Sequence, residues 1–246
     1  MRLVAIDIGT TFIKCGRFED DILQETWRYP TNDSGTAGGD LSNRIGDYEL
    51  AMSSVAPAAA RNIEKAIERP IYKVTPEGQN FIKGFHPEYG ADRVADTVAA
   101  RQFYAPKENL AVFALGTCTV LTTILAGGVV DGGFIALGYH RMISELQVAS
   151  PLVETIKDAD YKKYAFDFGF TTNDQIMNGA ALAQIGIVER WLRLVREKIG
   201  EPLVTVATGG NAALLMGQNN GSGKLIDYID PHLTIKGIQL IYRSSK

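Results

Sequence analysis

The stretch AIDIGTTFIK, residues 5–14, ends an apolar run on a carboxylate and turns at once through a glycine. A buried carboxylate is costly unless it meets a cation, a metal ion or hydrogen-bond donors. Gly9 and the two threonines after it offer backbone N–H groups and hydroxyls that can bind phosphate oxygens. In that interpretation Asp7 holds Mg²⁺, directly or through water, and Lys14 reaches a terminal phosphate. A hairpin with an aspartate-stabilised turn is an equally open alternative, and no GxxxxGK[ST] loop occurs in the chain.

A second group of polar residues lies in HPEYGADRVAD, residues 86–96, where a glycine begins a predicted helix. Asp92 and Arg93 fall in the first turn of that helix. One interpretation is that Asp92 acts as a general base while Arg93 grips an anionic substrate. The alternative is that Asp92 stabilises the helix N-terminus by interacting with the helix dipole.

A third candidate is TGGN, residues 208–211, which follows an apolar strand pattern and precedes a helix start. Two consecutive glycines allow the backbone to approach the flat base or the ribose of a nucleotide closely. A plain turn explains the same pattern equally well.

Composition excludes several other classes of function. The chain has 246 residues, a net charge of −3 and a pI near 5.7, so it has no electrostatic footprint for nucleic acid or an anionic membrane surface. No apolar run is long enough to span a membrane. The three histidines lie far apart, and the two cysteines form no CxxC pair, which argues against a zinc site. The N-terminus enters an apolar run directly without a signal-peptide pattern, so we expect a cytoplasmic protein.

Alternating strand and helix patterns position these candidate residues and predict an α/β fold. The glycine-, serine- and asparagine-rich segment 29–43 is expected to be a loop. A long helix is expected from Asn173 to Lys198, with its apolar stripe on Ile176, Ala180, Ala183, Ile187, Trp191 and Val195. The remaining elements are predicted as strands over 2–8, 12–19, 48–54, 70–74, 110–137 (two or three) and 202–208, and helices over 56–69 and 89–104.

The two halves of the chain contain the same local unit. IDIGTT at residues 6–11 aligns with FALGTC at 113–118, so that Gly9 corresponds to Gly116 and Asp7 to Ala114. Each copy follows one apolar strand and precedes another. We therefore expect two domains of related topology, residues 1–107 and 108–246, that face a common nucleotide cleft.

Taken in order, DIGTTFIK, SSVAP, GADR, GTCT, GGVVDGGFIALG, TTNDQIMNGA and TGGNA resemble the motifs of type III pantothenate kinases. This family belongs to the acetate and sugar kinase/Hsc70/actin superfamily, so the resemblance implies two ribonuclease H-like domains of the actin-like ATPase type. It also implies ATP- and Mg²⁺-dependent phosphorylation of pantothenate, the first step towards coenzyme A. A monovalent cation, K⁺ or NH₄⁺, and a homodimer complete what the family implies.

The resemblance also implies roles for individual residues. Asp92 would take the proton of the pantothenate hydroxyl. Gly90, Ala91 and Arg93 would hold the substrate, and Thr172 would reach the pantothenate pocket across a dimer interface. Asp7 would organise the metal ion, and Thr10 stands where the family usually has asparagine. The nucleotide would contact Asp7, Ile8, Gly9, Thr10, Thr11, Phe12, Ile13, Lys14, Gly116, Thr117, Gly209 and Gly210.

The chain departs from the family pattern in its second glycine motif. The family usually has aspartates at the positions that Ala114 and Thr122 occupy here. Losing both removes negative charge from a site built around cations, which puts the monovalent-cation requirement in doubt. Two alternatives to an active pantothenate kinase therefore stay open. One is a catalytically impaired relative that binds nucleotide or pantothenate and acts as a regulatory protein, and the other is a kinase for a different hydroxylated substrate.

Overall fold

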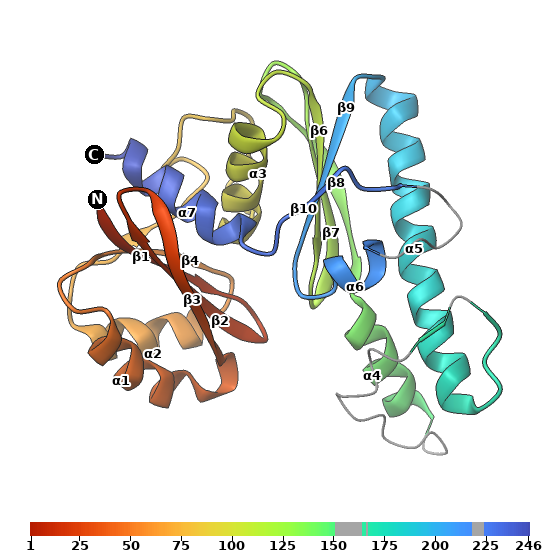
Figure 1. The fold of residues 1–246 in the computed structure, drawn as a ribbon, viewed down its shortest axis with the longest axis horizontal. Coiled ribbons are helices and arrows are strands. Elements are labelled where there is room, and N and C mark those ends of the chain that lie inside the picture. The colour runs from red at the N-terminus through yellow and green to blue at the C-terminus, as the bar shows by residue number, and fades with distance from the viewer. Residues whose placement is uncertain (151–163, 166, 218–223) are drawn as a thin grey trace. The chain divides into compact units, whose positions relative to one another are not determined.

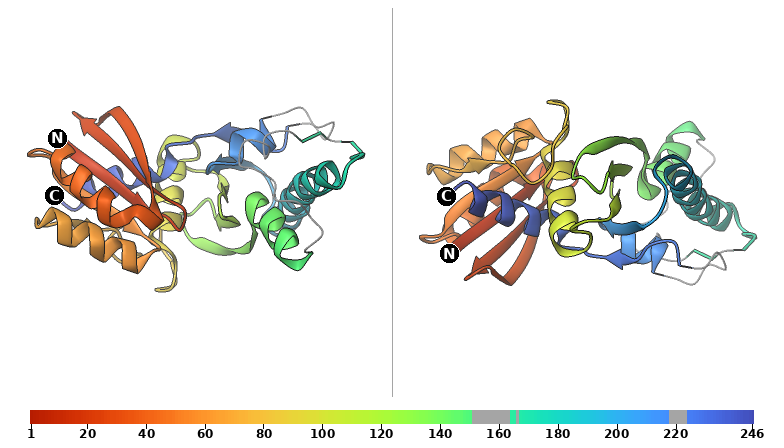
Figure 2. Two further views of the ribbon diagram at one scale, coloured as in Figure 1. Left: turned by 90° about the horizontal axis from the view of Figure 1, so that it is seen from below. Right: turned by 90° about the horizontal axis from the view of Figure 1, so that it is seen from above.

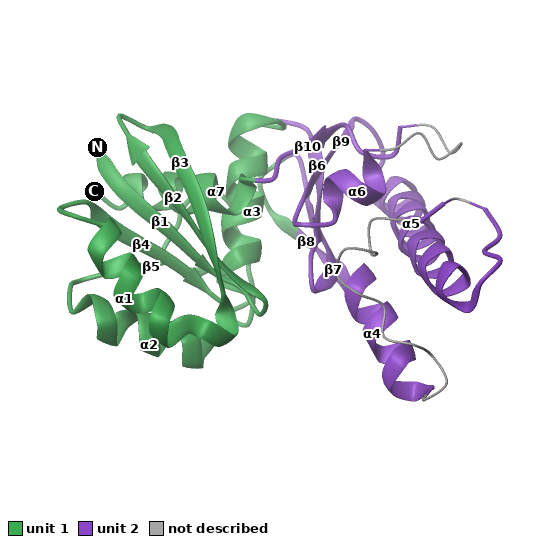
Figure 3. Cartoon of the chain, turned by 60° about the horizontal axis from the view of Figure 1, so that its bottom comes forward, with its two compact units in different colours: residues 1–106, 127–130, 232–246 green, residues 107–126, 131–231 purple. Residues whose placement is uncertain are grey.

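The computed structural model describes residues 1–150, 164–165, 167–217 and 224–246. The chain forms two compact α/β units (Figure 3). Unit 1 comprises residues 1–106, 127–130 and 232–246, and unit 2 comprises residues 107–126 and 131–231. The C-terminal segment, which the sequence assigned to the second domain, packs instead against helix and strand elements of unit 1.

Unit 1 contains a five-stranded sheet and four α-helices among its described residues (Figure 1). The sheet order is β3-β2-β1-β4-β5, with β1 antiparallel to β2 and parallel to β4. The elements are β1 (Arg2–Ile8), β2 (Phe12–Glu19), β3 (Ile22–Pro30), the 3₁₀ turn η1 (Thr31–Asp33), α1 (Ser34–Arg44), β4 (Glu49–Ser54), α2 (Pro57–Ile67), β5 (Tyr72–Lys73), α3 (Ala91–Phe103) and α7 (Leu233–Ser244).

Helices cover both faces of this sheet, which explains why β1 is apolar on both sides. Val4, Ile6 and Ile8 point to the face where α1 and α2 complete a hydrophobic core. The alternate residues of β1, among them Asp7, face α3 and α7. Figure 2 shows α7 beside α3, and both chain termini lie at this unit.

The prediction of a loop over 29–43 was wrong, because α1 occupies most of that segment. Its composition is typical of a loop, but Ala37, Leu41 and Ile45 recur at a spacing of four and are all buried. Gly38 serves packing here, since a Cβ atom at this position would lie 2.7 Å from the Cβ of Ala66 on α2. Tertiary contact with α2 therefore overrides the local preference.

Unit 2 repeats the sheet topology of unit 1. Its order, β8-β7-β6-β9-β10, matches β3-β2-β1-β4-β5 strand for strand, again with an antiparallel hairpin and a parallel neighbour. This confirms the internal repeat, with Gly9 after β1 and Gly116 after β6. The elements are β6 (Asn109–Leu115), β7 (Cys118–Ile124), β8 (Val130–Leu137), α4 (Tyr139–Ala149), α5 (Thr172–Ile199), β9 (Leu203–Thr208), α6 (Ala212–Met216) and β10 (Tyr228–Ile229).

The long helix is confirmed as α5, although its buried stripe is rotated from the predicted one. Ala183 is exposed and Ala180 is buried, whereas Val188 and Leu192 form core contacts that the predicted stripe omitted. Gln184 is fully buried and explains part of this rotation. It accepts a hydrogen bond from Thr119 and donates to the Leu137 carbonyl at 2.9 Å, which ties α5 to β7 and to the end of β8.

None of the helices in the described ranges is both long enough and apolar enough to cross a membrane.

Candidate active site

Asp7 lies near the carboxyl end of β1, the middle strand of the unit 1 sheet. In the strand register it is directly opposite Lys14 on β2 and Ser53 on β4. Residues paired in this way project from the same face of a sheet. The sequence-predicted pair Asp7 and Lys14 is therefore brought together, and Ser53 is a neighbour that the sequence analysis did not single out. The parallel pairing of β1 with β4, which no local pattern predicts, produces this third contact.

The environment of Asp7 disfavours its charged form. The side chain is buried, and Ser53 Oγ donates a long hydrogen bond of 3.4 Å to its Oδ1. Burial raises the pKa of this carboxyl to about 6; Lys14 and the Ser53 hydroxyl lower it, while the negative charge of Asp92 raises it. Burying this carboxylate in its charged form costs free energy, and Lys14 is the cation opposite it on β2. The arrangement fits a site that binds a further cation.

The first Gly-Thr loop is held by groups on both sides of it. Gly9 donates its N–H to the Phe12 carbonyl at 3.0 Å, so this particular N–H is engaged within the loop. Thr31, just after β3, donates its hydroxyl to the Gly9 carbonyl at 2.9 Å and its N–H to the Thr11 carbonyl at 3.0 Å. The turn between Ile8 and Ile13 is thereby fixed in one conformation. Thr31 was missed by the sequence analysis because it lay in the segment predicted as a loop.

Asp92 lies in the first turn of α3, as predicted, with Gly90 as the N-cap residue. Its Oδ1 accepts the backbone N–H of Arg93 at 2.8 Å. Burial raises the pKa of this carboxyl, while the Arg93 N–H and the Arg93 and Lys14 charges lower it. The contact with its own first turn is the one expected of a helix-stabilising aspartate. Its partial burial goes beyond what that role requires and makes Asp92 a stronger base.

The guanidinium of Arg93 lies over the ring of Tyr89, 4.2 Å from its centroid. Tyr89 in turn packs edge to face against Phe85, with the ring centroids 5.4 Å apart. This cation–π contact holds the arginine in a defined place beside Asp92. The tyrosine comes directly before Gly90, so its contribution could have been read from the sequence as part of the same turn.

Asp96, which the sequence analysis did not single out, joins these charges from the next turn of α3. It lies four residues after Asp92, and its burial raises its pKa, as do the charges of Asp92 and Asp7. α3 is shielded on every side over this part of its length, because each residue from Val94 to Arg101 is buried. Unit 1 thus brings Asp7, Lys14, Asp92 and Asp96 into one electrostatic group.

Unit 2 assembles its own set of predicted residues around the second Gly-Thr loop. The Asn211 N–H donates to the Leu115 carbonyl at 2.9 Å, and its side-chain amide reaches the Gly116 carbonyl at 3.3 Å. Gly209, with a φ of +97°, approaches so closely that a Cβ atom would lie 2.5 Å from the Leu115 oxygen. The TGGN turn therefore packs directly on the Gly116–Thr117 loop, with Gly210 in the same turn.

Gly138 supports the second loop from another direction. It donates its N–H to the Thr117 carbonyl at 2.9 Å, and a Cβ atom there would lie 2.1 Å from the Gly116 oxygen. The loop is one residue shorter than its counterpart, since the Gly116 N–H bonds the Cys118 carbonyl. Ala114 and Val120 are opposite one another where unit 1 has Asp7 and Lys14. The second loop therefore lacks both charges of the first.

Thr172 begins α5 and is exposed. The preceding Thr171 caps the helix, accepting the Asp174 N–H at 3.1 Å, while Asp174 accepts the Thr171 N–H at 3.2 Å. The helix start is thus well defined without using the Thr172 side chain.

A metal site made by protein side chains alone requires several ligating groups close together. Within the described ranges, no three His, Cys, Asp or Glu side chains come close enough to hold a metal ion by themselves. Mg²⁺ needs no such cluster, since one or two carboxylates together with substrate phosphates usually hold it.

The family model and two similar relatives point to the same family of proteins. The family model for type III pantothenate kinases matches residues 3–194. A type III pantothenate kinase of Dehalococcoides mccartyi is 30% identical over 267 residues, covering 100% of this chain and 98% of the relative. One from Parafrankia sp. is 28% identical over 257 residues, covering 99% and 98%.

Solved structures share the fold at lower identity. The ethanolamine utilization protein EutJ of Carboxydothermus hydrogenoformans superposes with a TM-score of 0.62 at 16% identity, covering 98% of this chain and 90% of that one. A ROK family glucokinase of Streptomyces griseus, crystallised with glucose and AMPPNP, gives a TM-score of 0.53 at 13% identity, covering 99% of this chain and 100% of that one. At these identities the similarity establishes the actin-like ATPase fold alone.

Proposed function

Because the chain belongs to the type III pantothenate kinase family, we propose that it transfers the γ-phosphoryl group of ATP to the primary hydroxyl of pantothenate. The product is 4′-phosphopantothenate, and the reaction is the first step of coenzyme A synthesis. The observation that carries this proposal is the group formed by Asp7, Lys14 and Asp92 in unit 1. It combines a metal-binding carboxylate, a phosphate-binding cation and a partly buried base.

In the proposed reaction Asp92 accepts the proton of the pantothenate hydroxyl. As the bond from that oxygen to the γ-phosphorus forms, the bond to the β,γ-bridging oxygen breaks and ADP leaves. A carboxyl whose pKa is raised by burial suits this task, because a stronger base takes the proton more readily. Arg93, held on Tyr89, pairs with the pantothenate carboxylate. Gly90 and Ala91 let the substrate approach the helix start.

Lys14 and Asp7 act on the phosphates in this proposal. Lys14 contacts the terminal phosphate, and the loop from Ile8 through Ile13 binds the phosphate chain. Mg²⁺ fits the oxygen donors of Asp7 and Ser53, because it prefers oxygen ligands and shares its site with substrate phosphates. When bound, this ion neutralises phosphate charge.

In unit 2 we propose that the nucleotide contacts the Gly116–Thr117 loop and the Gly209–Gly210 turn packed on it. The requirement for K⁺ or NH₄⁺ implied by the family does not fit this loop, because Ala114 and Thr122 supply no carboxylate. We therefore propose activity without either monovalent cation.

We also propose a homodimer in which Thr172 of one chain lies near Asp92 and Arg93 of the other. The exposed face of α5 supports it, because Gly179, Leu182, Ala183 and Gly186 follow one another at helical spacing and are all exposed. Small residues let a second helix approach closely. The side chain of Leu182 is 47% exposed among the described residues, so it offers an apolar surface to a second helix.

The test is a coupled assay of ADP formation by the full chain with ATP and Mg²⁺. ADP should appear only when pantothenate is present, at equal rates in K⁺, NH₄⁺ and Na⁺ salts of equal ionic strength. Nucleotide or pantothenate binding without ADP formation would favour a regulatory relative.

An ATP-dependent enzyme of this kind works where ATP is supplied, so the cytoplasm is the compartment we propose.

A further inference from the structure

Asp96 is a buried carboxyl that the proposed reaction leaves without a task. It accepts a hydrogen bond of 2.7 Å from the hydroxyl of Thr234, which lies on α7 and is 138 positions away in the sequence. Both side chains are buried. Burying a carboxyl costs free energy unless its hydrogen-bonding capacity is used, so a contact of this kind is retained only in a specific arrangement.

The position of Asp96 relates this contact to the base. Asp92 and Asp96 are four residues apart on α3, so their side chains lie on the same face of the helix, one turn apart. Asp7 and Lys14 act electrostatically on both of them. A shift or rotation of α3 that moves Asp96 therefore moves Asp92 relative to Lys14 and Asp7.

α7 packs against α3 at very short range. A Cβ atom on Gly237 would lie 1.9 Å from the carbonyl oxygen of Ala95, so the two backbones touch next to Asp96. On the other side of α7, the methyl group of Ile235 occupies the space that a side chain at Gly16 would need. α7 thus lies beside α3 and packs on the sheet that carries Asp7.

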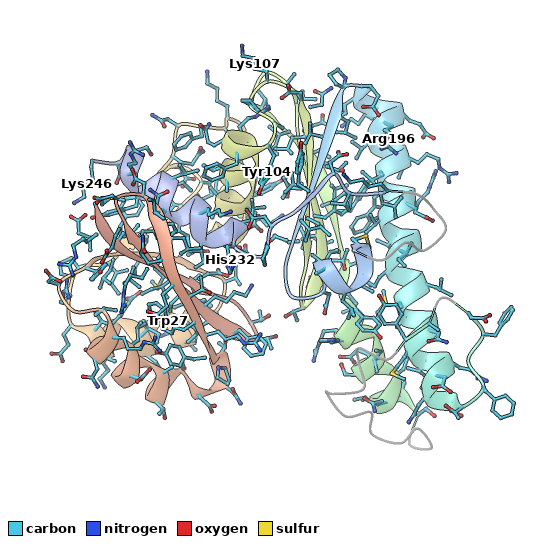
Figure 4. All side chains as sticks on the ribbon, viewed as in Figure 1. Trp27, Tyr104, Lys107, Arg196, His232 and Lys246 are labelled. Carbon is cyan, nitrogen blue, oxygen red and sulfur yellow. The ribbon has the colours of Figure 1, made fainter. Side chains whose placement is uncertain are left out.

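α7 begins and ends within unit 1, and its C-terminal end is tied to other elements of that unit. His232, the N-cap residue, and Lys246, just beyond the C-terminus of the helix, mark these ends in Figure 4. Lys246 pairs with Glu49 on β4 at 2.8 Å, and Arg243 pairs with Asp21 at 2.6 Å. The Thr234–Asp96 bond is therefore made by a helix whose C-terminal end is tied to β4 and to the turn between β2 and β3.

We propose that Asp96, held by Thr234, is a positioning residue for phosphoryl transfer, which makes the C-terminal helix α7 a structural part of the acceptor site. The bond sets the rotation of α3 and hence the place of the Asp92 carboxylate relative to Lys14 and Asp7. This inference rests on the proposed function for the role of Asp92. Residues remote from Asp92 in the sequence would then determine the position of its carboxylate.

Four variants of the full chain test this inference. Thr234→Val removes the hydroxyl without changing shape, Thr234→Ser keeps it, and Asp96→Asn keeps the acceptor oxygen. Thr205→Val is the matched control, because Thr205 is equally buried in unit 2 and donates its hydroxyl to Asp227 at 2.8 Å. We expect Thr234→Val to lower kcat about 10-fold with the KM for ATP unchanged, since small displacements of a catalytic group are costly. Thr234→Ser and Asp96→Asn should stay within about 3-fold of wild type, and Thr205→Val should match wild type in kcat.

A wild-type kcat in Thr234→Val, or an equal loss in Thr205→Val, would overturn the inference. So would a loss in Asp96→Asn as large as that in Thr234→Val, since the hydrogen bond persists there. Hydrogen exchange of the ligand-free proteins gives a readout independent of activity. We expect the amides in the first two turns of α3 to exchange about 10-fold faster in Thr234→Val and at the wild-type rate in Thr205→Val. If wild type fails to phosphorylate pantothenate, the proposed function fails, and exchange alone decides whether Thr234 positions α3.

Discussion

A Cβ atom on Gly90 would lie 2.5 Å from Oδ1 of Asp92 and 3.1 Å from Cγ1 of Val55. The φ of Gly90 is −58°, so its backbone conformation is open to any residue, and the glycine is needed for space. The absent side chain is what lets Asp92 fold over the start of α3 and accept the Arg93 N–H. Gly90 thereby determines where the proposed base lies.

Gly90→Ala should therefore displace the Asp92 carboxylate and lower kcat by about 10²-fold, as misplacement of a catalytic group by about 1 Å does. Steady-state kinetics of ADP formation measures this. Gly39→Ala is the control, because Gly39 is exposed in α1 and an added Cβ meets no described atom within 4 Å. It should keep full activity and stabilise the helix by about 0.5–1 kcal/mol. Unchanged kcat in Gly90→Ala would contradict this account of the glycine.

Asp92→Asn keeps the size and an acceptor oxygen but removes basicity, so kcat should fall by about 10²-fold or more. The Kd for Mg·ATP, measured by calorimetry, should stay close to wild type, since Asp92 serves the hydroxyl substrate. Asp47→Asn is a suitable control because Asp47 is an exposed carboxylate that pairs with Arg2 at 2.7 Å. Near-normal turnover in Asp92→Asn would assign the base to another residue.

The raised pKa of Asp7 predicts a specific pH dependence of stability. In the unfolded chain this carboxyl ionises near its ordinary pKa of 3.8, and in the folded, ligand-free protein near 6. Between these values the folded state keeps a proton that the unfolded state has lost. The contribution of Asp7 to the free energy of unfolding therefore falls as pH rises from about 4 to about 6 and then levels off. The difference between the two pKa values corresponds to about 3 kcal/mol.

Asp7→Asn removes this penalty. The variant should be more stable than wild type by up to about 3 kcal/mol at pH 8, and the gain should shrink towards zero near pH 4. Urea unfolding of both ligand-free proteins across this range measures the difference, in which the titration of other groups cancels. A gain independent of pH would mean that ionisation of Asp7 is not its source. Mg·ATP should stabilise wild type and not the variant.

Much of the fold was predictable because hydrophobic patterning and the repeated Gly-Thr unit are local signals. β1, β2, α3 and α5 follow from these signals, and so does the correspondence of Gly9 with Gly116. The segment forming α1 was not predictable from composition, since Ala37, Leu41 and Gly38 become helical by packing on α2. The placement of α7 in unit 1 depends on contacts with α3 that join distant parts of the sequence.

The candidate site likewise contains residues that local sequence patterns predict and residues that only tertiary contacts bring in. Asp7, Lys14, Asp92 and Arg93 are recognisable because each lies beside a glycine turn or a helix start. Ser53 joins them only through the parallel register of β1 and β4, and Asp96 through burial against Thr234. An aspartate is ordinarily exposed, so no local pattern marks Asp96, and only the α3–α7 packing makes it internal. The nucleotide cleft and the pairing of Thr172 with a second chain stay predictions.

The last prediction concerns the proposed homodimer. Leu182→Glu places a charge on the exposed apolar face of α5 next to Gly179 and Gly186, where a second helix would pack, so it should convert the dimer to a monomer. Sedimentation velocity at micromolar concentration measures the oligomeric state. Because Thr172 would then no longer reach a second acceptor site, the KM for pantothenate should rise about 10-fold or more while the Kd for ATP is unchanged. Ile22→Glu is the matched control, since Ile22 on β3 is also a large apolar residue and is 65% exposed, and it should leave both the dimer and the KM intact. A wild-type chain that sediments as a monomer with full activity would remove the shared pocket from the proposal.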